Sequence, residues 1–220
     1  MNWFENIRWP EITKATNDTL TMLGVTMVFT VIIGLIVGIV LFLTSSGQML
    51  QNRIVYSILS FIVNILRSIP FIILMILIMP MTKMLVGQSW GVKGAIPPLI
   101  VAAAPFFARL VEASLREVDR GVIEAAQAMG ASRWRIIWSV LLRESRTGLL
   151  AAITITAVTL VGYTAMSGVI GGGGLGDLAI RYGYQGYKLD LMLVTVAILI
   201  IMVQILQMVG DALVRRFSRK

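Results

Sequence analysis

Long apolar runs separated by short charged stretches dominate this sequence of 220 residues. A run of about 20 apolar residues is long enough to cross the roughly 30 Å hydrocarbon core of a membrane as a helix. The pattern therefore predicts an all-α, polytopic membrane protein with five membrane-spanning helices. The expected spans are residues 20–43, 54–82, 94–111, 148–170 and 191–210.

The second of these spans is the least regular, because it contains Arg67, Pro70 and Pro80. Proline removes a backbone hydrogen bond and kinks a helix. Two alternatives follow: one long helix that bends at Pro70, or a shorter span over residues 68–81 with an interfacial lead-in. A charge facing lipid at the membrane centre is costly. We therefore expect Arg67 to reach an interface rather than to face the bundle.

The composition supports a membrane protein, with 57% apolar and 14% charged residues. Ordinary soluble domains are roughly 45–50% apolar and about 25% charged. A soluble enzyme, a disordered chain and a fibrous repeat are therefore excluded. The chain has no Cys and no His, so we expect no disulfide, no metal site and no catalytic residue.

The net charge of +8 is unevenly distributed and predicts the orientation of the chain. Seven arginines lie between residues 109 and 146, and the segment 211–220 carries four basic residues. Basic loops stay in the cytoplasm, so the loop 112–147 and the tail 211–220 are expected there, and the N-terminal segment 1–19 outside. The basic charge is assigned to topology and anionic lipid rather than to nucleic acid. We find no removable signal peptide pattern, so the first span is the expected anchor.

The long cytoplasmic loop is predicted to hold two short helices. Residues 122–129 are rich in helix formers, Gly130 permits a left-handed stop, and Ser132 can cap a second helix over residues 133–142. Its expected apolar face consists of Trp134, Ile137, Val140 and Leu141. Periodicity alone leaves two interpretations open: a helix lying on lipid headgroups, or one docking onto a partner protein.

The residues of this loop favour docking. Glu124, Ala125, Ala126 and Gly130 resemble the EAA signature of permease subunits of ATP-binding-cassette importers. The family pattern ends in a proline where this chain has Arg143, so the second helix is expected to end differently. The resemblance implies that these four residues form the element that couples the chain to a separate ATPase.

The resemblance covers nearly the whole chain and is closest to permeases of the methionine-importer type. The matching strings, in order, are residues 67–71, 79–82, 104–106, 162–166, 171–176 and 182–187. The resemblance implies a homodimer of this chain in the inner (plasma) membrane, two cytoplasmic ATPase subunits that bind ATP–Mg, and an external substrate-binding protein. It implies no cofactor in the chain itself.

The absence of a phosphate loop agrees with a separate ATPase. No G-x-x-x-x-G-K-[ST] string occurs, and we expect the glycines at 171–174 to form a tight outer turn rather than a phosphate site. Ion-driven carriers bury ionisable residues in their spans, whereas spans 20–43, 148–170 and 191–210 contain none. Three alternatives remain: transport of another small amino acid or organic anion, a structural membrane subunit without transport, and a passive channel, for which the polar rings of a pore are missing.

The fourth span carries a hydroxyl series that predicts the transport path. Thr156, Thr159 and Tyr163 are spaced for one helical face, and Met166 follows three residues later. We expect the first three to line the path and Met166 to form part of a gate. The alternative is that the hydroxyls bond back to carbonyls of their own helix.

Two further patterns receive structural interpretations. Gly34 and Gly38 form a G-x-x-x-G pair, which can serve as a dimer seam but more often packs against a neighbouring helix of the same subunit. Glu112 and Glu117 lie among arginines and are expected to form a solvated ion-pair face rather than a catalytic pair.

Overall fold

The computed structural model describes residues 8–218, and within this range every regular element is helical. Four of these helices are long and apolar enough to cross a membrane. They are α1 (Trp9–Thr44), α4 (Gly91–Arg116), α8 (Arg146–Ser167, continued by the 3-10 turn η2, Gly168–Ile170) and α10 (Leu189–Ser218). The all-α, polytopic fold is confirmed.

The predicted span 54–82 is not one continuous helix. It consists of α2 (Arg53–Ser68) and α3 (Phe71–Val86), which meet at an angle of 109°. Pro70 has no N–H to donate and disfavours helical backbone at the preceding residue. Ile69 is accordingly extended, with φ −81° and ψ 126°. The fifth crossing therefore exists only if this broken pair counts as one span.

The first and last helices extend furthest beyond their predicted ends. The first begins at Trp9, with proline in its first turn, so most of the predicted outer segment 1–19 is helical. Ile12, Ala15 and Thr19 continue the buried face of α1 into this polar stretch, which a count of charges alone does not detect. The last helix runs to Ser218, so the predicted tail is also helical. Residues 1–7 and 219–220 lie outside the described part.

The first helix packs closely along the fourth through its glycines. A side chain built on Gly34 would lie 2.9 Å from the carbonyl oxygen of Ala104, and one on Gly38 would lie 2.6 Å from that of Ala108. Only glycine permits this approach between the two backbones. The G-x-x-x-G pair therefore joins two helices of the same chain.

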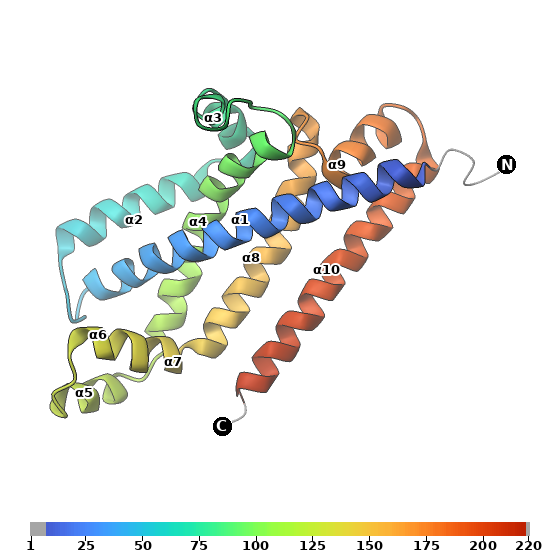
Figure 1. The fold of residues 1–220 in the computed structure, drawn as a ribbon. Coiled ribbons are helices and arrows are strands. Elements are labelled where there is room, and N and C mark those ends of the chain that lie inside the picture. Colours follow the sequence, from blue (N-terminus) through green and yellow to red (C-terminus); the bar gives the residue numbers. More distant parts are fainter. Residues whose placement is uncertain (1–7, 219–220) are drawn as a thin grey trace.

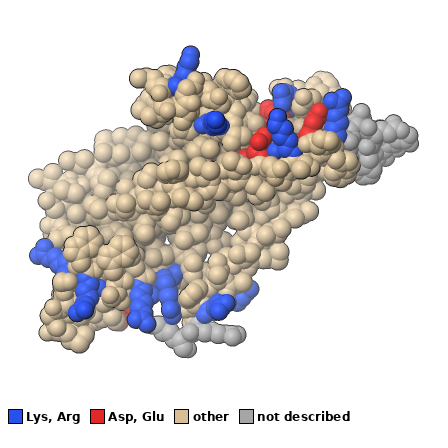
Figure 2. Space-filling model, viewed as in Figure 1, with Lys and Arg blue, Asp and Glu red and all other residues tan. Residues whose placement is uncertain are grey.

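The short elements gather at the two ends of the bundle (Figure 1). Helices α5 (Arg120–Ala128), α6 (Arg133–Arg135) and α7 (Leu142–Glu144) lie at the same end as the C-terminus, and α3 and α9 (Gly174–Leu178) lie at the opposite end. In this view, Lys and Arg gather over the α5–α7 end, whereas both signs of charge occur near α9 (Figure 2). Lys and Arg also occur over the opposite end (Figure 2), so the excess of positive charge at the α5–α7 end is what agrees with the predicted cytoplasmic side.

The glycines before α9 form a tight turn, as expected. Gly171, Gly173 and Gly174 have φ values of 77°, 81° and 80°, which other residues adopt only with strain. The backbone N–H of Leu175 donates to Thr19 Oγ1 at 2.8 Å. The turn therefore anchors α9 to the first helix.

Candidate coupling surface and transport path

The first helix of the loop between α4 and α8 ends as its sequence predicts, and it begins at Arg120, before the predicted start at residue 122. The carboxylate of Asp119 accepts from the N–H of Gly121 at 2.7 Å and caps the start of α5. At the other end, Gly130 has φ 76°, and the N–H of Ala131 donates to the carbonyl of Ala126 at 3.0 Å. A left-handed glycine that closes a helix in this way fixes the direction of the following chain.

The second helix of the loop differs from its prediction. Ser132 Oγ accepts from the N–H of Arg135 at 3.4 Å and caps α6, but the chain then forms a π-helix, η1 (Ile136–Leu141), before α7. A π turn holds more residues than an α turn, so the expected spacing of the apolar face does not apply. Ile137 and Leu141 are buried as predicted, whereas Trp134 is 71% exposed.

The four predicted coupling residues divide into two groups. Glu124, Ala125 and Gly130 lie on the exposed side of the loop. Ala126 is only 5% exposed and, together with Ile123, joins an apolar cluster formed with the ends of α1 and α4. The small side chain of Ala126 therefore fits the interior of this chain, and the docking role remains a prediction for the other three.

Exposed apolar side chains lie along the same loop, and the sequence interpretation named only one of them, Trp134. Their exposed fractions are large for residues of this type. They are Val122, Met129, Trp134 and Trp138. Large apolar side chains on an otherwise charged surface are typical of a protein or membrane interface. The signal was present in the sequence, because aromatic and methionine residues interrupt an arginine-rich stretch.

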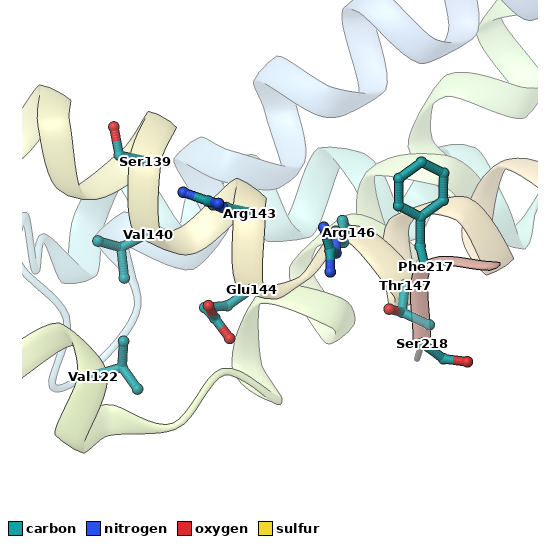
Figure 3. A pocket seen from close by; sticks show the side chains of 9 residues that line it. All are labelled: Val122, Ser139, Val140, Arg143, Glu144, Arg146, Thr147, Phe217 and Ser218. Atoms are coloured by element: carbon teal, nitrogen blue, oxygen red, sulfur yellow. The ribbon is translucent and has the colours of Figure 1, made fainter. Parts of the chain in front are cut away.

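A cleft of about 460 Å³ lies beside the coupling loop (Figure 3). Its side chains come from α5, η1, α7, α8 and the last turn of α10. They are Val122, Ser139, Val140, Arg143, Glu144, Arg146, Thr147, Phe217 and Ser218. The guanidinium of Arg146 lies 5.4 Å from the ring centre of Phe217, which is within the range of a cation–π contact. This contact joins the start of α8 to the last turn of α10.

The hydroxyl series of α8 bonds mainly to its own helix. Thr156 and Thr159 each donate to the carbonyl four residues earlier at 2.8 Å. Thr156 is fully buried, Thr159 is half-buried, and Met166 is 39% exposed. The open face of α8 therefore contains Thr159 and Met166 but not Thr156. These hydrogen bonds to carbonyls of α8 itself account for the hydroxyls of Thr156 and Thr159, and the role of the two residues in a transport path stays untested.

Tyr163 belongs to a cavity at the break between α2 and α3. Its ring stacks on Phe71, with ring centres 4.7 Å apart and planes within 5°. The cavity has a volume of about 260 Å³. It is lined by Leu66, Arg67, Ile69, Phe71, Ala102, Phe106 and Tyr163.

Arg67 lies near the end of α2, beside the same cavity. Its guanidinium lies 5.9 Å from the ring centre of Phe106 on α4. The side chain is exposed in the single chain and lines the cavity from its open side. An interfacial position for Arg67 therefore stays a prediction.

Glu112 is buried rather than solvated, which also corrects the sequence interpretation. It is 3% exposed, and its carboxylate accepts from Arg109 and from Arg116, each at 2.6 Å. The hydroxyl of Tyr56 donates to it at 3.3 Å. Arg109 also donates to the carboxamide oxygen of Asn64 at 2.9 Å. This network, which we call the Glu112 cluster, joins α2 to the end of α4.

Comparison with known proteins covers nearly the whole chain. Residues 30–220 match the family described as "Binding-protein-dependent transport system inner membrane component". The chain is 46% identical over 218 residues to the methionine import system permease protein MetP of Bacillus subtilis, covering 99% of this chain and 98% of MetP. It is 51% identical over 151 residues to the D-methionine transport system permease protein MetI of Escherichia coli, covering 69% of this chain and 70% of MetI.

A solved structure has the same fold along its full length. It is a chain of the MetNI methionine ABC transporter in an inward-facing conformation, 45% identical to this chain, with a TM-score of 0.94. The match covers 97% of this chain and 100% of that chain. The broken second span and the short helices between α4 and α8 therefore belong to a fold already seen in a transporter subunit.

Proposed function

Because the chain belongs to the family of binding-protein-dependent transport system inner membrane components, we propose that it is the membrane-spanning permease subunit of an ATP-driven methionine importer. The single observation that carries the proposal is the full-length match to the MetNI chain, with a TM-score of 0.94 at 45% identity. The chain forms the transport path and does not hydrolyse ATP, because the hydrolysis takes place on a separate ATPase bound to ATP–Mg.

The proposed assembly contains two copies of this chain, two cytoplasmic ATPase subunits and an external binding protein. The excess of basic over acidic residues at the α5–α7 end supports a cytoplasmic position for that end and an outer position for the N-terminus (Figure 2). Exposed Cys introduced at Gln185 and at Ser218 test this orientation, since the chain has no native Cys. In intact cells, an impermeant thiol reagent is expected to label Q185C and not S218C. The reverse pattern would overturn the orientation.

We assign coupling to the exposed side of the loop, with Glu124, Ala125 and Gly130 in contact with the ATPase. A β-branched side chain is strained at the φ of Gly130, so Gly130→Val is expected to loosen ATPase attachment in co-purification. Gly130→Asn is the matched control, because Asn adopts this conformation more readily. Equal attachment of both variants would contradict the role of the left-handed stop.

We place the transport path along the open face of α8, with Thr159 and Tyr163 along it and Met166 at the gate. A long apolar side chain from each of two subunits can close a narrow path by excluding water. Met166→Ala is expected to raise ATP turnover without the binding protein while the complex still assembles. Basal turnover equal to the parent's would remove Met166 from the gate.

The decisive experiment is reconstitution of the chain with its ATPase and binding protein in vesicles. Uptake of radiolabelled L- and D-methionine is expected to require ATP on the ATPase side and the binding protein on the other. Absence of ATP-dependent methionine uptake, with uptake of another small amino acid or an organic anion instead, would overturn the substrate assignment. Absence of any uptake would favour a structural subunit.

A further inference from the structure

Arg67 carries a charge that the described residues do not neutralise. Its one close partner is the ring of Phe106, and none of the ion pairs between residues 8 and 218 includes it. A guanidinium inside a membrane protein is stable when it meets an anion or a water-filled cavity. The cavity beside Arg67 therefore has room for the missing anion.

The break at Pro70 adds further positive potential to the same cavity. Helix α3 starts at Phe71 and has no side chain capping its first N–H groups. Uncapped N–H groups and the helix dipole both favour an anion at this end. Broken membrane helices in transporters present their N-termini to anionic groups of the substrate in this way. Phe71 lines the cavity, so the start of α3 borders the space that Arg67 faces.

The other walls of the cavity suit an apolar side chain. Phe71, Phe106 and Tyr163 contribute three aromatic rings, and Ala102 leaves space between them. A thioether packs favourably against aromatic rings. The phenol of Tyr163 adds one hydroxyl that can donate or accept. At about 260 Å³, the cavity has room for a small molecule with one anionic end and one apolar end.

We propose that this cavity binds the transported amino acid during its passage, with Arg67 pairing with its carboxylate and the three aromatic rings packing on its side chain. The proposal rests on the proposed function, because it takes methionine as the transported molecule. A planar guanidinium binds a carboxylate through two parallel hydrogen bonds, which a lysine cannot reproduce. Arg67 is thus a binding residue of the path and not only a structural one.

The test uses the complete transporter in vesicles and compares Arg67→Gln and Arg67→Lys with the parent. Arg53→Gln is the matched control, because Arg53 begins the same helix and does not line the cavity. We expect methionine uptake per ATP hydrolysed to fall at least tenfold in Arg67→Gln, to fall less in Arg67→Lys, and to stay within twofold in Arg53→Gln. ATP turnover stimulated by the binding protein should persist, because the coupling loop is unchanged.

A second measurement uses the parent protein alone, so its result does not depend on whether a variant folds. Methionine retained by the purified transporter without its binding protein should be displaced by unlabelled methionine but not by methioninol, which lacks the carboxylate. Displacement by both, or unchanged uptake per ATP in Arg67→Gln, would overturn the proposal. An Arg67→Gln defect confined to vesicles that contain phosphatidylglycerol would assign Arg67 to a lipid phosphate instead. A parent that imports no methionine would overturn the proposed function itself.

Discussion

Two arginines on the contact between α2 and α4 have opposite surroundings. Arg109 donates to Glu112, to the backbone and hydroxyl of Ser60 and to a carboxamide, so its charge is fully met within the chain. Arg67 lies about one turn beyond Asn64 on α2, and among the described residues its guanidinium has the ring of Phe106 as its close partner. The same pair of helices therefore contains one neutralised and one unpaired guanidinium.

The difference separates a structural charge from a functional one. A buried carboxylate between two arginines contributes little net stability compared with apolar packing, but removing one partner leaves an uncompensated charge. The Glu112 cluster thus fixes α2 to the end of α4, from which the chain leads directly into the coupling loop. An arginine without an ion-pair partner does not hold two helices together, and its charge can pair with a ligand. Four substitutions test this contrast, from the largest expected effect to the smallest.

Removing the carboxylate of the paired site should have the largest effect. Glu112→Ala leaves Arg109 and Arg116 without their shared partner, and we expect a loss of about 3–5 kcal/mol in the free energy of unfolding. Thermal unfolding of the purified complex measures it. Glu117→Ala is the control, since Glu117 is exposed, and should change stability by less than about 0.5 kcal/mol. Equal stability of the two variants would show that the cluster does not hold the helices together.

Placing a carboxylate beside Arg67 should strongly reduce methionine uptake without lowering the free energy of unfolding. In Phe106→Glu the new carboxylate can pair with Arg67, so we expect methionine uptake to fall about tenfold or more, a change of about 1.4 kcal/mol. Phe106→Gln removes the same ring without adding charge. Uptake by this control should stay well above that of Phe106→Glu, and equal losses would show that the ring, not the free charge, is what matters.

Removing one hydroxyl from the paired site should have a small effect. Tyr56→Phe deletes the hydrogen bond to Glu112, which measures 3.3 Å, while both ion pairs remain. We expect a loss of about 0.5–1.5 kcal/mol in unfolding free energy and unchanged uptake per ATP. A loss as large as that of Glu112→Ala would mean that the tyrosine, rather than the charges, organises the cluster.

Removing a hydroxyl that is hydrogen-bonded to a carbonyl of its own helix should have the smallest effect. Thr156→Val keeps the shape of a fully buried side chain, and the carbonyl of Ala152 keeps its helical N–H partner. We expect stability to change by less than about 0.5 kcal/mol and uptake to remain within twofold. A severe transport defect in this variant would show that the hydroxyl leaves its own helix during transport.

The sequence predicts the helices well because lipid imposes a simple rule of length and apolarity. Four spans, the left-handed stop at Gly130 and the cap at Ser132 follow from local chemistry, and the structure confirms them. Helix ends are predicted less well. The start of α1 lies in a polar stretch whose buried face contacts α9, a segment more than 150 residues away in the sequence.

The surroundings of the charged residues are not predictable from local patterns. Glu112 looks solvated because arginines flank it in the sequence, yet the packing of α2 buries it. Arg67 looks interfacial because a charge in lipid is costly, but the cavity that it lines at the break before Pro70 has no signal in the sequence. In both cases the deciding partner comes from another helix, and a pattern along one helix contains no information about it.

The π-helix of the coupling loop makes the phase between that loop and α8 tolerant of one change in chain length. A π turn arises when one additional residue is accommodated within an α-helix. Deleting one residue within the six of η1 would convert the turn to α-helix and leave the segments on its two sides in nearly the same phase. Deleting one residue from the first turns of α8, where no π turn takes up the change, would instead rotate the loop by about 100° relative to the rest of that helix. A single deletion is therefore expected to be tolerated in η1 and to uncouple the loop when it is made in α8, even where every contacting side chain is kept.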